Sequence, residues 1–206
     1  IDVTRYGAIA DSTTDNATAI NNAVNACPPS TAALTSAGCT VFFPYSGTGN
    51  YLIKSSINVN TGSTLQDGVR LVGECTSLGT GSTRGTAAPL TCSTIIANGT
   101  FTSSDVMLVI GKSTIKTHGF VLQDLGFSDT STSNNQVPGA IHLVTVEHFS
   151  LIHPTCFAFS AASPNGYCMK FDGGSDFTQF GIVINPSVEK VRFPVITNGN
   201  TSEINF

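Results

Sequence analysis

The chain of 206 residues has no tryptophan, two methionines and few charged side chains. Asp, Glu, Lys and Arg make up 11% of it, against roughly 25% in an average soluble domain. Its formal net charge of −4 excludes a polybasic protein that binds nucleic acid through phosphate contacts. The longest apolar runs, such as 106–110, are much shorter than the roughly 20 residues of a membrane-spanning helix. We therefore expect neither nucleic acid nor a membrane as a partner.

Motifs for common cofactors are missing as well. No two cysteines are separated by two residues, which argues against a zinc knuckle or a redox dithiol. There is no glycine-rich dinucleotide fingerprint, and no serine or cysteine nucleophile motif accompanies the histidines. We expect no bound cofactor, with calcium as an option if the protein is a polysaccharide lyase.

What the sequence does contain is an even number of cysteines, six in all. Six cysteines allow 15 pairings, and an even number without metal-binding spacing is typical of disulfides formed in an oxidising compartment. We favour sequential pairing, because each pair encloses a loop-like segment: Cys27 with Cys39, Cys75 with Cys92, and Cys156 with Cys168. Glycosylation sequons at Asn16, Asn98 and Asn200 also indicate a secreted, extracellular glycoprotein.

The pattern of apolar residues predicts one helix followed by many strands. In 15–27 the apolar residues recur at the spacing of one helical face, with Thr13 and Thr14 as available N-caps and two prolines at the end. Short β-branched or aromatic segments then predict strands at 40–43, 51–53, 57–59, 69–72, 94–97 and 106–110. No strand is followed by a helical segment long enough for a βαβ unit, which leaves a sandwich or a solenoid.

A recurring six-residue pattern favours the solenoid. The pattern is apolar, polar, polar, apolar, small or polar, apolar, and it occurs at 122–127, 146–151 and 188–193. The offsets of 24 and 42 residues correspond to one and two turns of a coil with about 21 to 24 residues per turn. In such a coil the polar pair forms a corner, and Leu125, Phe149 and Val191 point inward and stack on neighbouring turns.

The first 75 residues resemble a known superfamily. The segments 6–20 (YGAIADSTTDNATAI), 40–44 (TVFFP), 51–53 (YLI) and 69–74 (VRLVGE) are similar to the opening of pectate-lyase-like proteins. This is the branch shared by rhamnogalacturonase-like and exo-β-1,3-glucanase-like enzymes and by phage tailspikes. The chain departs from the usual motif at Ser12, Asn16 and Tyr45, which lie in turns. The resemblance implies an all-β fold, a right-handed parallel β-helix with an N-terminal capping helix.

We interpret residues 1–206 as a single β-helix domain and as the N-terminal part of a longer protein. The cap region comprises 1–39, and the rungs comprise 40–206. The last residues, 202–206, have the pattern of a strand with no cap after it, and an exposed terminal rung favours pairing with other strands. We therefore expect self-association, or contact with a further chain, through this end.

The candidate catalytic residues are Asp172, Asp176 and Glu147. Hydrolysis of a polysaccharide needs two carboxyl groups about 5 to 9 Å apart, and a β-helix brings such groups together on neighbouring rungs. Asp172 and Asp176 flank a Gly-Gly turn after a predicted strand, whereas Glu147 holds the repeat position of Gln123 and Glu189. An aromatic platform for a sugar has to come from tyrosine or from the thirteen phenylalanines, most of which occupy core-type positions.

These observations predict a secreted carbohydrate-active β-helix protein, either a polysaccharide lyase or a glycoside hydrolase, whose partner is an extracellular polysaccharide. The alternative is a non-catalytic structural or adhesive β-helix, similar to a tailspike or a filament-forming protein. Two close carboxylates in a groove would distinguish the enzyme from this alternative, in which the acids are scattered.

Overall fold

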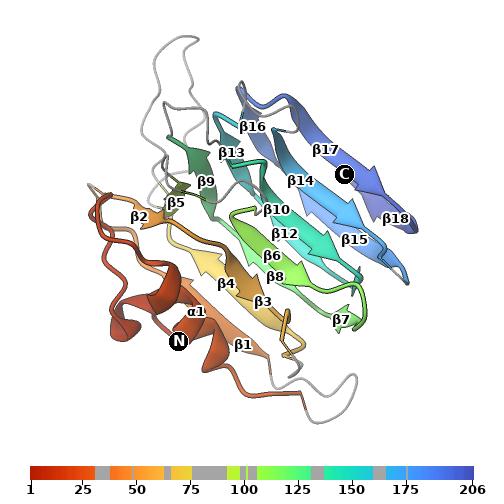
Figure 1. Ribbon diagram of the computed structural model, residues 1–206, viewed down its shortest axis with the longest axis horizontal. Helices are drawn as coiled ribbons and strands as arrows, with labels where there is room; N and C mark the ends of the chain where they lie inside the picture. Colours follow the sequence, from red (N-terminus) through yellow and green to blue (C-terminus); the bar gives the residue numbers. More distant parts are fainter. Residues whose placement is uncertain are drawn as a thin grey trace.

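A computed structural model of the chain describes residues 1–30, 38–47, 49–62, 66–75, 92–97, 101, 106–130, 137–159, 166–174 and 176–206. Its strands stack in register into three sheets, which wind into a β-solenoid of about four turns (Figure 1). The fold is the predicted right-handed parallel β-helix, with its one α-helix near the N-terminus.

Every pair of these strands is parallel, and each sheet runs along the solenoid axis. Sheet A contains β1 (Cys39–Phe43), β4 (Val69–Gly73), β7 (Thr117–His118), β8 (Val121–Gln123), β11 (Val146–Glu147), β12 (Ser150–Ile152), β15 (Thr178–Ile184) and β18 (Thr201–Asn205). Sheet B contains β2 (Tyr51–Ile53), β5 (Thr94–Ala97), β9 (Gly126–Asp129), β13 (Thr155–Phe157) and β16 (Ser187–Glu189). Sheet C contains β3 (Ile57–Val59), β6 (Leu108–Gly111), β10 (Gly139–Val144), β14 (Tyr167–Asp172) and β17 (Phe193–Asn198).

The N-terminal cap consists of η1 (Val3–Tyr6) and α1 (Ala17–Asn25), which pack on each other and on the first strands (Figure 1). The predicted helix is confirmed, and its buried face is Ala17, Ile20, Ala23 and Val24. The predicted threonine caps are wrong, because the N-cap is Asn16 and its side chain makes no capping bond. Thr13 and Thr14 instead donate their backbone N–H groups to Asp11, at 2.8 and 2.7 Å, which closes the turn before the helix.

The amide of Asn16 ties the cap to the first rung. Its Oδ1 accepts from the backbone N–H of Ile9, and its Nδ2 donates to the carbonyls of Ile9, Thr14 and Leu52. Asn16 has no exposed surface, so a glycan on it is incompatible with this fold and the prediction of glycosylation there is wrong. Asn200 is exposed and its glycosylation stays a prediction, whereas Asn98 lies outside the described residues.

The length of a turn differs from the prediction. Leu122 on β8 pairs with Leu151 on β12, and Leu151 pairs with Val183 on β15, so these turns are about 30 residues long rather than 21 to 24. The three copies of the six-residue pattern therefore do not stack on one another. Glu147 pairs with His118 and Gln179, and the predicted equivalence of Glu147 with Gln123 and Glu189 is wrong.

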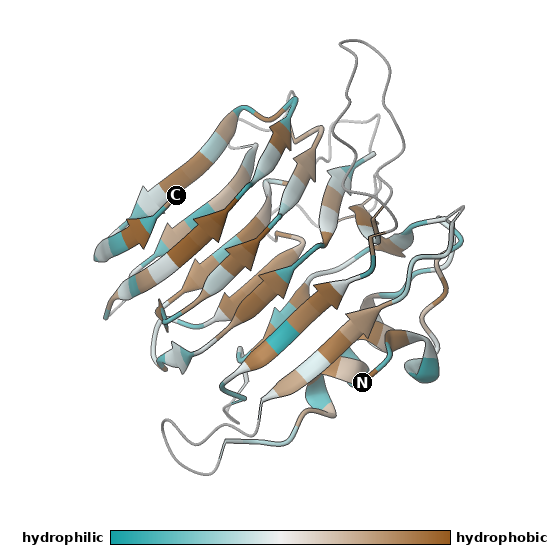
Figure 2. Cartoon of the chain, turned by 180° about the vertical axis from the view of Figure 1, so that it is seen from behind, coloured by the Kyte–Doolittle hydropathy of each residue, from teal (hydrophilic) through white to brown (hydrophobic). Residues whose placement is uncertain are grey.

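The pattern nevertheless identified corners correctly. Asp124, His148 and Lys190, which hold one position in the three copies, all have left-handed φ angles, of 53°, 54° and 55°. Leu125 and Phe149 are buried as predicted, while Val191 on the last turn is partly buried and packs against the core. Figure 2 shows apolar positions recurring along the stacked strands, which is the pattern expected of inward-facing side chains.

Three disulfides join Cys27 to Cys39, Cys75 to Cys92 and Cys156 to Cys168, which confirms the sequential pairing. They are consistent with folding in an oxidising compartment. Within the ranges described above, no helix is long and apolar enough to cross a membrane.

Candidate functional site

Five polar residues occupy corresponding positions on successive turns, on the outer side of sheet A. We call this set the polar ladder: Asp67, His118, Glu147, Gln179 and Ser202. Each member contacts the next, because parallel strands in register place equivalent side chains about 4.8 Å apart. The ladder thus gathers residues from turns that are far apart in the sequence.

Glu147, one of the predicted catalytic residues, lies at the centre of the ladder. Its Oε1 accepts from Lys116 Nζ and from Gln179 Nε2, both at 2.8 Å, and its Oε2 lies 3.5 Å from His118 Nε2. Lys116 Nζ also lies 3.1 Å from Oδ2 of Asp176. One ammonium group therefore joins two of the three predicted acids.

These contacts set the charges in the centre of the site. Burial raises the pKa of Glu147, but hydrogen bonds from Lys116 and Gln179 outweigh it, so the pKa lies below its ordinary value. The hydrogen bonds to Glu147 and Asp176 raise the pKa of Lys116 in turn. At neutral pH Glu147 is a carboxylate and Lys116 is an ammonium ion, so Glu147 is suited to act as a base or nucleophile.

A buried carboxylate, that of Asp67, lies on the side of His118 opposite Glu147. Asp67 is only 5% exposed, and its Oδ1 accepts from the backbone N–H of His118 at 2.8 Å and lies 3.7 Å from His118 Nδ1. Asp67 therefore anchors the strand that carries His118, whose imidazole lies between two carboxylates. In the described part of the chain, Nδ1 of His118 and Oδ2 of Asp67 are buried without a hydrogen-bond partner.

Asp172 belongs to a second, neighbouring cluster at the end of β14. Its Oδ1 accepts from the backbone N–H of Gly174 at 3.0 Å, while Oδ2 lies 3.3 Å from Asn198 Nδ2, 3.4 Å from Lys170 Nζ and 3.7 Å from His142 Nε2. Burial raises the pKa of Asp172. The hydrogen bond from the Gly174 N–H and the charge of Lys170 together lower it by more, so the pKa lies below its ordinary value. Burial lowers the pKa of His142.

The two clusters meet at one corner of the solenoid. Thr178 Oγ1 donates to the carbonyl of Asp172 at 2.7 Å and accepts from the backbone N–H of Val146 at 3.2 Å.

Through Lys116, the structure pairs Asp176 with Glu147 rather than with Asp172. Sequence reasoning missed Lys116 and the partnership of His118 with Glu147. The signal was the alternation Lys116–Thr117–His118, which places the lysine and the histidine on one side of an extended segment.

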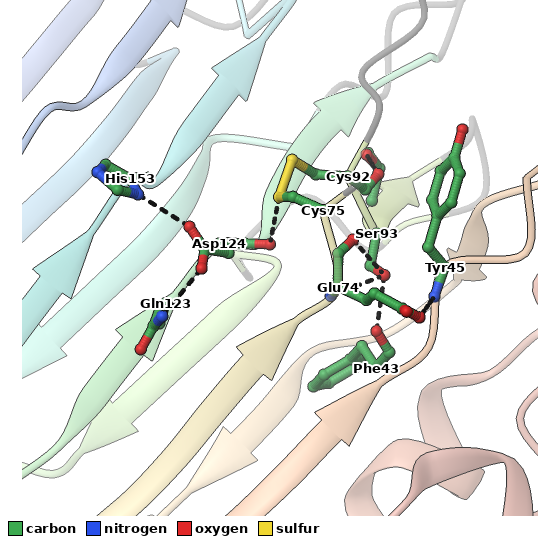
Figure 3. The surroundings of a disulfide bond; sticks show 10 residues. Phe43, Tyr45, Glu74, Cys75, Cys92, Ser93, Gln123, Asp124 and His153 are labelled. Carbon is green, nitrogen blue, oxygen red and sulfur yellow. Dashed lines mark hydrogen bonds and ion pairs between the residues drawn. A yellow bond between two sulfur atoms is a disulfide. The ribbon is translucent and has the colours of Figure 1, made fainter. Parts of the chain in front are cut away.

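A third polar stack lies at the corner between sheets A and B and has the features of a structural brace. Asp124, His153 and Asn185 all have left-handed φ angles. Asp124 Oδ1 lies 2.9 Å from His153 Nδ1. The other ring nitrogen of His153, Nε2, lies 3.4 Å from Asn185 Nδ2. Figure 3 shows Asp124 and His153 of this stack beside the Cys75–Cys92 disulfide, with Gln123 donating to Asp124 at 2.9 Å. These polar groups bond to one another along the axis, so they hold successive turns together.

No group of three or more His, Cys, Asp or Glu side chains forms a potential metal site among the residues that the structure describes. The chemistry that the described site offers on its own is acid–base chemistry by carboxylates, assisted by a lysine and a histidine.

A parallel β-helix with an N-terminal capping helix is the architecture that the resemblance to pectate-lyase-like proteins implies. The model of the family described as "Rhamnogalacturonase A/epimerase, pectate lyase-like" matches residues 1–170. The chain belongs to this family, which confirms the resemblance seen in the first 75 residues. A comparison with curated protein sequences gives no match.

Solved structures with this fold include carbohydrate-active and adhesive proteins. An iota-carrageenase complexed to iota-carrageenan fragments is 13% identical, with a TM-score of 0.60 over 98% of this chain and 39% of the carrageenase. The surface adhesin PfbA of Streptococcus pneumoniae is 15% identical, with a TM-score of 0.58 over 92% of this chain and 39% of the adhesin. ORF18 of Geobacillus virus E2 is 17% identical, with a TM-score of 0.52 over 98% of this chain and 40% of the viral protein. The present chain spans about two fifths of each of these proteins.

Proposed function

We propose that this protein is a secreted glycoside hydrolase that cleaves an extracellular polysaccharide, with Glu147 and Asp176 as its two carboxyl groups. The observation that carries the proposal is their shared contact with Lys116. The two contacts put the nearest carboxylate oxygens no more than about 6 Å apart, which is compatible with the spacing of hydrolytic carboxyl pairs. The three disulfides support the extracellular location.

The charges favour a division of roles. Glu147, with its lowered pKa, supplies the anion that attacks the anomeric carbon or activates water. Asp176, whose side chain is 43% exposed, is accessible to a glycosidic oxygen, and we assign it the second role, in which it has to take up a proton before it acts as the acid. An upper limit of about 6 Å between the nearest oxygens favours the closer carboxyl spacing of retaining enzymes over the wider spacing of inverting enzymes, so we expect hydrolysis with retention of configuration.

The same contacts argue against one route to lysis, in which Lys116 is the base. A lyase needs a base that removes the proton beside a uronate, and a lysine serves as that base only when it is neutral. The pKa of Lys116 is raised by its two carboxylate partners, which keeps the side chain charged.

The proposal is tested by incubating the protein with uronans and with neutral β-glucans. We expect new reducing ends without the ultraviolet absorbance of an unsaturated product, and proton NMR should show the retained anomer first. Unsaturated product would contradict hydrolysis, and no cleavage of any polysaccharide would contradict the enzymatic function.

Lys116→Met is expected to move the acid limb of the pH–activity profile to higher pH. The wild-type lysine lowers the pKa of Glu147, so its removal lets that pKa rise, and Glu147 then loses its charge at a higher pH. The profile of kcat/KM against pH measures this shift. Lys190→Met is the control, since Lys190 lies over the ring of Phe157, on sheet B. An unchanged acid limb in the Lys116 variant would contradict the assigned role.

A further inference from the structure

Phe180 is a bulky residue at a backbone position that normally favours glycine. Hydrogen bonds between successive turns align Gly68, Gly119, His148 and Phe180 at one corner of sheet A. Their φ angles are 73°, 71°, 54° and 54°. Glycine adopts such angles without strain, whereas a large side chain there is strained and persists only where something compensates for the strain. The last two of these four positions therefore carry aromatic rings at an energetic cost.

The side chain of Phe180 is largely exposed, so burial of its apolar surface does not offset the backbone strain. Phe180 is 46% exposed, and its ring stacks on the His148 ring with centroids 5.0 Å apart and planes 22° apart. Each of the two residues directly follows a member of the polar ladder, Glu147 or Gln179. Phe177, which directly follows Asp176, is 44% exposed. Exposed aromatic residues thus directly follow both members of the carboxyl pair or their ladder neighbour in the chain, and exposed apolar surface commonly marks a ligand-binding site.

We propose that the Phe180–His148 stack is a binding platform for a neutral pyranose ring of the polysaccharide. The apolar C–H face of such a ring packs on an aromatic face, and the platform holds the chain against Glu147. This inference rests on the function proposed above and names its substrate class. As expected, most of the thirteen phenylalanines serve the core, and Phe177 and Phe180 are among the four that are exposed.

The charges around the platform select against an acidic sugar. Glu147 directly precedes His148, Asp176 lies four residues before Phe180, and Glu203 occupies the next turn at the same corner, with a φ of 53°. Lys116 is already bonded to two carboxylates, so it offers little attraction to a third. A uronate on the platform would face uncompensated like charge, whereas a neutral sugar pays no such cost.

The decisive variant is Phe180→Gly, measured in a Glu147→Gln background so that the probe is not consumed. Glycine relieves the backbone strain, so we expect the thermal midpoint to stay the same or rise. We expect affinity for a neutral β-glucan or galactan hexasaccharide to fall about tenfold or more in calorimetric titration. Phe180→Trp should retain binding. Phe193→Ala, which removes a ring that is 40% exposed at the start of β17, is the matched control and should bind as the parent does.

The outcomes separate this inference from the proposed function. If Phe180→Gly binds as tightly as its parent, or if the parent binds neither hexasaccharide, the platform is refuted even where the wild-type protein cleaves polysaccharide. Tighter binding of an oligogalacturonate of the same length would overturn the neutral class. If binding depends on Phe180 but the wild-type protein cleaves nothing, the platform stands and the hydrolase proposal falls.

Discussion

Replacing Glu147 by Gln is expected to lower the rate of polysaccharide hydrolysis by about 10² to 10⁴-fold. Glutamine preserves the size of the side chain and an oxygen that can accept from Lys116, but it removes the negative charge that attack or water activation needs. The expected change lies in kcat, because the substitution leaves the aromatic surface beside the site in place. Initial rates of reducing-end formation at saturating substrate measure this change.

The control for Glu147→Gln is Glu189→Gln. The sequence pattern places the two glutamates at one repeat position, but Glu189 is exposed on β16 in sheet B, away from the polar ladder. We expect Glu189→Gln to cleave at the wild-type rate, and circular dichroism should show that both variants keep the β-helix. Normal cleavage by Glu147→Gln, or an equal loss in both variants, would show that Glu147 is not the attacking carboxylate.

The comparison of these two glutamates shows how far sequence alone reaches in this fold. Left-handed corners are local features, so a six-residue pattern identified three of them, at Asp124, His148 and Lys190. Which corner belongs to which stack depends on the number of residues in each turn. Turns of a β-helix vary through their loops, and the observed turns of about 30 residues differ from the 21 to 24 that the pattern suggested.

The dependence on strand register also explains how much of the candidate site could be predicted from the sequence. Asp172, Asp176 and Glu147 could be selected individually, because an acid beside a glycine turn or a short strand is visible in the sequence. Their grouping could not, since the bond from Lys116 to Glu147 depends on the register between β7 and β11. An exposed phenylalanine cannot be distinguished from a core phenylalanine by composition. The exposure of Phe180 follows from a corner conformation that the sequence pattern did not assign to it.

Phe149→Ala is expected to destabilise the protein by about 3 to 5 kcal/mol. Phe149 is 1% exposed, and its ring stacks on Phe171 with centroids 5.4 Å apart. On the next turn the position facing it is Gly181, where an added Cβ would collide with the Phe149 ring. Because glycine has no side chain that can move into the space, the substitution leaves a cavity that the surroundings cannot refill.

Urea denaturation followed by circular dichroism measures this loss of stability, and Phe177→Ala provides the matched control. Phe177 is 44% exposed, so its removal should change the free energy of unfolding by no more than about 0.5 kcal/mol. The contrast distinguishes a phenylalanine that fills the solenoid from one that lies on its surface. An unchanged denaturation midpoint for Phe149→Ala would mean that the ring does not support the stacked turns. It would also contradict the strand register that aligns the members of the polar ladder beside it.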